Sequence, residues 1–75
     1  MQKETFINQM KARGYDIETV RSCKVIARKG DITLRWVSLA DYGVYISTPT
    51  AKAITDEGAT DEETLRIIDA LTIQP

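Results

Sequence analysis

Histidine is absent from this sequence, and cysteine occurs once, at Cys23. Without histidine, imidazole acid–base catalysis, Ser–His and Cys–His nucleophilic pairs, and histidine-containing zinc sites are excluded. One cysteine forms neither an intramolecular disulfide nor a Cys-only metal site, and small secreted domains usually need disulfides. We therefore expect a cytoplasmic protein in which Cys23 is a small buried side chain rather than a reactive thiol.

Long apolar runs are also absent. No run approaches the roughly 20 residues needed to span a bilayer, and the polar residues after Met1 contain no export signal. The glycines are isolated, so no phosphate-binding loop is present. A chain of 75 residues with 43% hydrophobic and 28% charged residues is typical of a single compact domain over residues 1–75, too small for a deep pocket. We expect no membrane association, no cofactor, no metal and no enzymatic activity.

Charge is present in both signs but is unevenly distributed along the chain. Residues 1–40 hold eight Lys/Arg against four Asp/Glu, whereas residues 41–75 hold two against seven. This asymmetry indicates either separate basic and acidic faces or two halves whose charges mix on folding.

Apolar residues at helical spacing predict a helix near each end of the chain. The first covers roughly residues 3–13 and stops at Gly14. Its inward stripe consists of Phe6, Ile7 and Met10. The second covers about residues 61–71, where Thr60 and Glu63 have the spacing of a capping box. Its stripe consists of Leu65, Ile67, Ile68 and Leu71.

Between the helices the apolar period changes to two, which predicts strands. A two-residue turn at Gly30 and Asp31 brings the apolar positions of residues 23–36 onto one face, and any other turn length scrambles that agreement. The expected cross-strand pairs are Ala27 with Leu34 and Val25 with Trp36.

The next hairpin has two alternative registers. A three-residue loop at residues 41–43 turns Val44 and Ile46 inward beside Trp36 and Ser38. A four-residue loop starting at Ala40 instead gathers Val37, Leu39, Val44 and Ile46, and only a bulge near Ser38 reconciles the two sets. Residues 15–22 are ambiguous and are interpreted as a strand extension. Residues 50–55 follow Pro49 and form either an edge strand or a loop.

These elements predict an α+β fold in the order α-β-β-β-α, with a three-stranded, or at most four-stranded, antiparallel sheet carrying both helices on one face. We expect Trp36 in the core, because the helix stripes need a large partner and the indole N–H can be satisfied at the core edge. The other face of the sheet then meets water or a partner. It carries Lys24, Ile26, Arg28, Thr33, Arg35, Val37, Tyr45 and Ser47.

That composition favours a small protein-binding module or inhibitor, of the kind that phages and mobile elements encode. On the exposed sheet face the expected contacts are Ile26, Arg35, Val37 and Tyr45. The acidic segment 56–63 is the alternative contact, through Asp56, Glu57, Asp61 and Glu62, and it lacks the ligand spacing of an EF-hand. A homodimer is a variant of this hypothesis, since self-association buries the same apolar residues.

Nucleic-acid binding is the second hypothesis. The basic residues for it are Lys24, Arg28, Lys29 and Arg35. The order α-β-β-β-α resembles that of double-stranded-RNA-binding domains, but such domains have a basic start to their final helix, whereas this helix opens with acidic residues. A pI near 5.3 also argues against affinity dominated by phosphate contacts. We therefore expect a protein partner ahead of nucleic acid.

Overall fold

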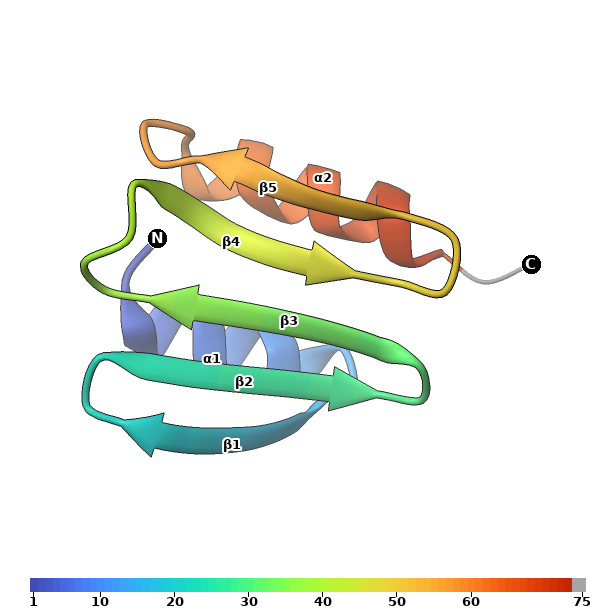
Figure 1. Ribbon diagram of the computed structural model, residues 1–75, viewed down its shortest axis with the longest axis horizontal. Helices are drawn as coiled ribbons and strands as arrows, with labels where there is room; N and C mark the ends of the chain where they lie inside the picture. The colour runs from blue at the N-terminus through green and yellow to red at the C-terminus, as the bar shows by residue number, and fades with distance from the viewer. Residues whose placement is uncertain (74–75) are drawn as a thin grey trace.

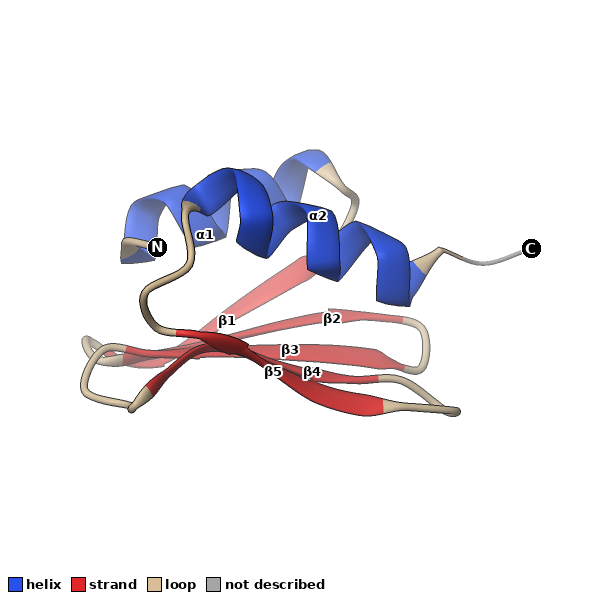
Figure 2. Ribbon diagram, turned by 90° about the horizontal axis from the view of Figure 1, so that it is seen from above, coloured by secondary structure: helices blue, strands red, loops and turns tan. Residues whose placement is uncertain are grey.

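A computed structural model describes residues 1–73 and shows five strands between two helices. The elements are α1 (Lys3–Ala12), β1 (Asp16–Arg21), β2 (Lys24–Lys29), β3 (Ile32–Val37), β4 (Tyr42–Ser47), β5 (Lys52–Asp56) and α2 (Asp61–Thr72). The strands form one antiparallel sheet in the order β1-β2-β3-β4-β5, so each strand pairs with its neighbour in sequence (Figure 1). Both helices lie on the same face of this sheet (Figure 2). The α+β class and the two-layer arrangement are therefore confirmed.

The prediction of three or four strands was too low. The ambiguous segments 15–22 and 50–55 form the two edge strands, β1 and β5. Their sequence signal is weak because edge strands are largely exposed: in β1 only Ile17 is even half-buried, and a register shift between Thr19 and Arg21 interrupts the alternation. With five strands, the likeness in element order to double-stranded-RNA-binding domains no longer holds.

The first hairpin has the predicted register. Val25 is opposite Trp36, Ala27 is opposite Leu34, and all four side chains are buried. Gly30 has a φ of +58°, in the left-handed region that a two-residue hairpin turn requires of its first residue.

Both predicted registers of the second hairpin were wrong. Trp36 is opposite Val44, and the connection is residues 38–41, with Leu39 at 92% exposure. The three-residue loop nevertheless turned Val44 and Ile46 to the correct face, because the observed register differs from it by four residues and an even shift preserves the face. The alternative four-residue loop starting at Ala40 predicted an inward-facing Leu39, which the exposure of Leu39 contradicts.

The core lies between the helices and the sheet. Trp36, at 9% exposure, belongs to it as predicted. Its other buried hydrophobic members are Phe6, Met10, Tyr15, Val25, Ala27, Ile32, Leu34, Val44, Ile46 and Ile68. The predicted stripe of α2 is only partly correct, because Thr64 is buried with Ile68 while Ile67 and Leu71 are exposed. This helix covers one edge of the sheet, over β4 and β5 (Figure 2), so a narrower stripe suffices.

Both helix ends follow the sequence signals. Gly14 has a φ of +86° after α1, and its N–H donates to the carbonyl of Lys11 at 3.0 Å. At the start of α2, the Thr60 hydroxyl accepts from the Glu63 backbone N–H at 3.1 Å, and the Glu63 carboxylate accepts from the Thr60 N–H at 3.3 Å. The capping box is therefore confirmed.

Two polar contacts join the helices, which run in the same direction. At one end the Met1 ammonium lies 3.8 Å from Asp61. At the other, Arg13 donates to both carboxylate oxygens of Asp69, at 2.7 and 3.0 Å. The hydrogen bond from Arg13 lowers the pKa of Asp69.

Asp69→Asn should destabilise the fold at neutral pH by at most about 1 kcal/mol, because both side chains of the pair are partly exposed to water. A carboxyl whose pKa is lower in the folded state stabilises above its unfolded pKa, about 3.9, and loses that contribution as the pH falls through the folded value. Urea unfolding should therefore show a larger difference between Asp69→Asn and wild type at pH 7 than at pH 2.5. Asp41→Asn, in an exposed loop, is the control, and an equal loss there would contradict the assignment.

Candidate functional site

The sheet face opposite the helices, here termed the open face, carries a continuous row of side chains across all five strands. Directly paired residues share a face, and the strand registers align Glu18, Ile26, Arg35, Tyr45 and Ile54 in succession from β1 to β5. We call this the central row. It contains three of the four predicted contact residues, and the fourth, Val37, lies two residues from Arg35 on the same face.

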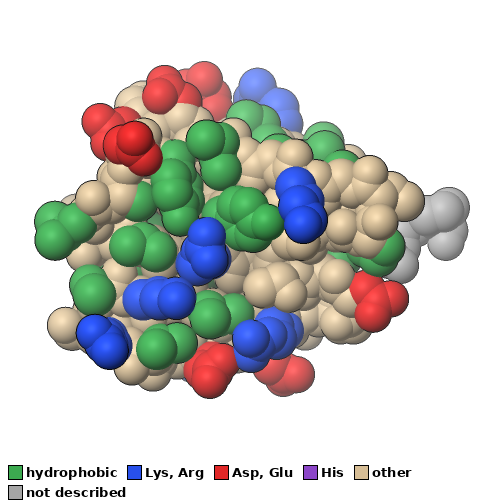
Figure 3. Space-filling model, in the orientation of Figure 1, with side chains coloured by type: hydrophobic (Ala, Val, Ile, Leu, Met, Phe, Trp, Pro, Cys, Tyr) green, Lys and Arg blue, Asp and Glu red, His purple; other side chains and the backbone are tan. Residues whose placement is uncertain are grey.

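Two further sets of side chains flank the central row. On one side the registers align Asp16, Arg28, Thr33, Ser47 and Lys52. On the other side Lys24 is opposite Val37. Figure 3 shows this face, with hydrophobic and basic side chains interleaved over its centre and acidic ones near its margins. The strand registers thus place on this face all the residues of β2, β3 and β4 that were predicted to lie there.

Arg35 and Tyr45, which are opposite each other on β3 and β4, form a stacked pair. The guanidinium carbon lies 4.7 Å from the centre of the tyrosine ring, within the range of a cation–π interaction. Within residues 1–73 the Arg35 Nε is a buried donor without a hydrogen-bond partner. The contact with Tyr45 therefore restrains the guanidinium, and its Nε–H is not satisfied within residues 1–73.

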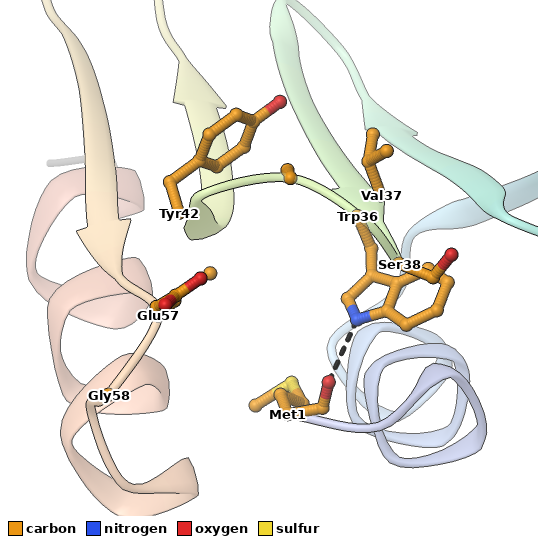
Figure 4. A pocket seen from close by; sticks show the side chains of 9 residues that line it. Met1, Trp36, Val37, Ser38, Tyr42, Glu57 and Gly58 are labelled. Atoms are coloured by element: carbon orange, nitrogen blue, oxygen red, sulfur yellow. Dashed lines mark hydrogen bonds between the residues drawn. The ribbon is translucent and has the colours of Figure 1, made fainter.

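A β-bulge at Gly43 adds a second tyrosine to the open face. The β4–β5 register shifts between Tyr42 and Tyr45, so Tyr42 is opposite Asp56 while Tyr45 is opposite Ile54. Because Asp56 and Ile54 are two residues apart on one strand, both tyrosines project to the same side. Figure 4 shows the Tyr42 ring turned away from the helices. Regular alternation would have placed residues 42 and 45 on opposite faces.

The residues of these rows that the sequence analysis did not place on the exposed face lie on β1, β4 and β5: Asp16, Glu18, Tyr42, Lys52 and Ile54. Ile54 is 61% exposed and ends the central row. Alternation gives little signal for Lys52 and Ile54, because residues 52–55 are Lys-Ala-Ile-Thr and it is the apolar Ile54 that faces outward. For Tyr42 the signal is weaker, since only Gly43 beside it indicates a bulge.

The electrostatics of the open face change from its centre to its edge. On β2, β3 and β4 the open face holds Lys24, Arg28 and Arg35 and no acidic residue. Arg28 forms an ion pair with Glu18 on the edge strand β1, with 2.8 Å between Nη1 and Oε2. In residues 1–73 neither Lys24 nor Arg35 takes part in an ion pair.

Lys29 does not belong to this surface. It is opposite Ile32, a core residue, and its Nζ donates to the carbonyl of Arg13 at 3.0 Å beside the ring of Tyr15. Of the four basic residues expected for nucleic-acid binding, the structure therefore brings together Lys24, Arg28 and Arg35 and separates Lys29 onto the helix-bearing side.

The acidic segment 56–63 is divided by its local contacts. Asp61 faces the amino terminus and Glu63 completes the capping box. This hydrogen bonding to Thr60 lowers the pKa of Glu63. Three exposed carboxylates remain, at Asp56, Glu57 and Glu62. Among residues 1–73, no group of three potential ligands could hold a metal ion.

A cleft of about 320 Å³ lies at one end of the sheet, next to the amino terminus (Figure 4). Its lining includes Met1, Trp36, Tyr42 and Glu57. The Trp36 Nε1 donates to the Met1 carbonyl at 2.9 Å, so the indole is already satisfied inside the fold. Trp36 therefore serves packing here, and the cleft offers no buried donor to a ligand.

Cys23 differs from its prediction. It lies in the turn between β1 and β2 rather than in a strand, and it is half-buried rather than buried. Because of the bulge near the end of β1, the last pair of this hairpin is Arg21 with Lys24. Cys23 therefore lies in the two-residue connection between the strands.

The chain was compared with protein-family models, with curated proteins and with solved structures. None of the three comparisons found a match. Within residues 1–73 no helix has the length and apolar character needed to cross a membrane. The candidate site therefore rests on the geometry and chemistry of the open face.

Proposed function

We propose that this protein is a non-enzymatic binding module whose open face contacts another protein. The observation that carries the proposal is the central row, in which Ile26 and Tyr45 flank Arg35, whose guanidinium stacks on the Tyr45 ring, and Ile54 lies beyond Tyr45. Tyrosine and arginine are the side chains that most often dominate the free energy of protein interfaces. No helix covers this face among the described residues, because α1 and α2 both pack on the other one (Figure 2).

Single-stranded nucleic acid is a second candidate, favoured by one observation. Tyr42 and Tyr45 share the open face with Lys24, Arg28 and Arg35, and aromatic side chains beside basic ones are how sheet surfaces stack and neutralise single strands. The net charge of −1 and the separation of Lys29 weaken this candidate, because such binding depends on phosphate neutralisation. A protein partner remains our first choice.

Replacing Arg35 and Tyr45 together by alanine should abolish partner capture and leave the fold intact. Both side chains project away from the core, and a cross-strand pair of this kind contributes at most about 1 kcal/mol to stability. Tagged wild type and the double variant are compared by affinity capture from a lysate of the source organism, with and without nuclease, followed by mass spectrometry. We expect a protein that survives nuclease with wild type and is lost with the variant.

A matched double variant on the other side of the molecule, Lys11→Ala with Ile67→Ala, is the control and should capture the same protein as wild type. Both of its residues are exposed on helices. Equal loss of capture by the two variants would contradict the open face as the contact. Capture of nucleic acid alone, removed by nuclease, would support the second candidate instead.

A further inference from the structure

We infer that the partner segment received by the open face is an acidic polypeptide, one that combines carboxylates with apolar side chains. This inference rests on the proposed function and adds the chemistry of the partner. Its first basis is charge: the open face of the three central strands carries Lys24, Arg28 and Arg35 and no carboxylate. The edge strands add Lys52 and the carboxylates of Asp16, Glu18 and Asp56, so the excess of positive charge lies over the three central strands, in a chain whose net charge is −1.

The second basis is the state of the Arg35 guanidinium. The guanidinium lies over the Tyr45 ring, 4.7 Å from its centre, and the buried Nε has no hydrogen-bond partner among the described residues. Because the Nε is buried, a partner's carboxylate would be met by the two Nη groups, which can donate two parallel hydrogen bonds to it. Pre-ordering by the ring also reduces the side-chain entropy that binding costs.

The third basis is the position of the apolar side chains relative to the basic ones. On β2, Ile26 lies between Lys24 and Arg28, and on β5, Ile54 lies two residues from Lys52. Ile26 is thus bordered by cations on both sides, and Ile54 by Lys52 on one side and Asp56 on the other. A segment in which leucine or aromatic residues are interspersed with Asp or Glu complements this arrangement in both respects.

A second copy of this chain fits the surface poorly. Two open faces stacked about a two-fold axis bring the same basic residues of each copy together, with Arg35 near the centre of both. Like charges opposed in an interface from which water is excluded are unfavourable. Charge complementarity therefore selects an acidic partner over self-association.

The test is selection from a displayed library of random dodecamer peptides on immobilised wild type, with affinities of the selected peptides measured in solution. We expect enrichment of Asp and Glu together with leucine or aromatic residues. Binding should weaken at least tenfold with Arg35→Ala plus Tyr45→Ala, and it should weaken as sodium chloride is raised, because exposed charges are screened. The charge-reversed variant Lys24→Glu plus Arg35→Glu should bind these peptides at least tenfold more weakly. In a selection of its own it should enrich peptides rich in Lys and Arg.

Thermal melting tests whether each variant is folded. If Lys24→Glu plus Arg35→Glu does not fold, Lys24→Glu plus Lys52→Glu is used as the charge-reversed variant instead. Peptides that depend on Arg35 and Tyr45 but show no acidic enrichment overturn this inference and leave the proposed function standing. Peptides that bind the Arg35→Ala plus Tyr45→Ala variant as tightly as wild type, or no enrichment at all, overturn both. A labelled single-stranded oligonucleotide that binds wild type more tightly than every selected peptide also overturns the inference, in favour of nucleic acid.

Discussion

Trp36→Ala should lower the free energy of unfolding by about 3–5 kcal/mol. The side chain is 9% exposed, belongs to the core cluster and donates from Nε1 to the Met1 carbonyl, so truncation creates a cavity and leaves that carbonyl without its partner. For a domain of 75 residues this is a large share of a total stability of about 5–15 kcal/mol. Urea denaturation followed by circular dichroism measures the loss.

Two further variants separate the contributions of the tryptophan. Trp36→Phe retains most of the ring but not the donor, and it should cost about 1 kcal/mol for the missing hydrogen bond beyond its packing change. Leu39→Ala, at the exposed tip of the β3–β4 connection, should change stability by less than about 0.5 kcal/mol. A Trp36→Ala loss as small as that of Leu39→Ala would mean that the two faces of the sheet are assigned the wrong way round.

Gly43→Ala should destabilise the protein by about 2–3 kcal/mol, since overpacking and a disturbed buried hydrogen bond combine. A methyl group at this position would collide with the Thr55 hydroxyl oxygen and lie 3.1 Å from the Asp56 carbonyl. Thr55 is buried, and its hydroxyl accepts from the Val44 N–H at 2.8 Å, so it cannot move aside without breaking that bond. Chemical denaturation measures the effect.

Gly58→Ala is the matched control for this prediction. Its added methyl would meet nothing closer than the Asp56 carboxylate at 3.5 Å, an ordinary contact, so we expect little change. In a Thr55→Ala background the cost of Gly43→Ala should fall, because the colliding oxygen is gone. An unchanged cost in that background would contradict the collision. Since the bulge at Gly43 also sets Tyr42 beside Tyr45, Gly43→Ala is expected to weaken partner binding as well.

Much of the fold could be predicted because some local signals are decisive. The turn at Gly30 and Asp31 fixed the β2–β3 register, since only one turn length places both apolar sets on one face. The capping box at Thr60 and the stop at Gly14 placed the helix ends for the same local reason. From these pairings followed the placement of Ile26, Arg35 and Val37 on the open face.

Other features depend on contacts between segments distant in sequence. Edge strands β1 and β5 exist because β2 and β4 offer them free backbone groups, and neither strand has a strong alternation of its own. The long β3–β4 connection could not be predicted, since several even shifts leave Val44 and Ile46 buried equally well.

The sequence by itself determined the class of fold, the main hairpin, the helix ends and the absence of histidine- and disulfide-based chemistry. Only the tertiary structure decided that Ile54 extends the central row and that a bulge brings Tyr42 beside Tyr45. The physical reason is that turn and cap signals act within a few residues, whereas the make-up of a sheet face depends on the register of every strand pair and on each bulge between them.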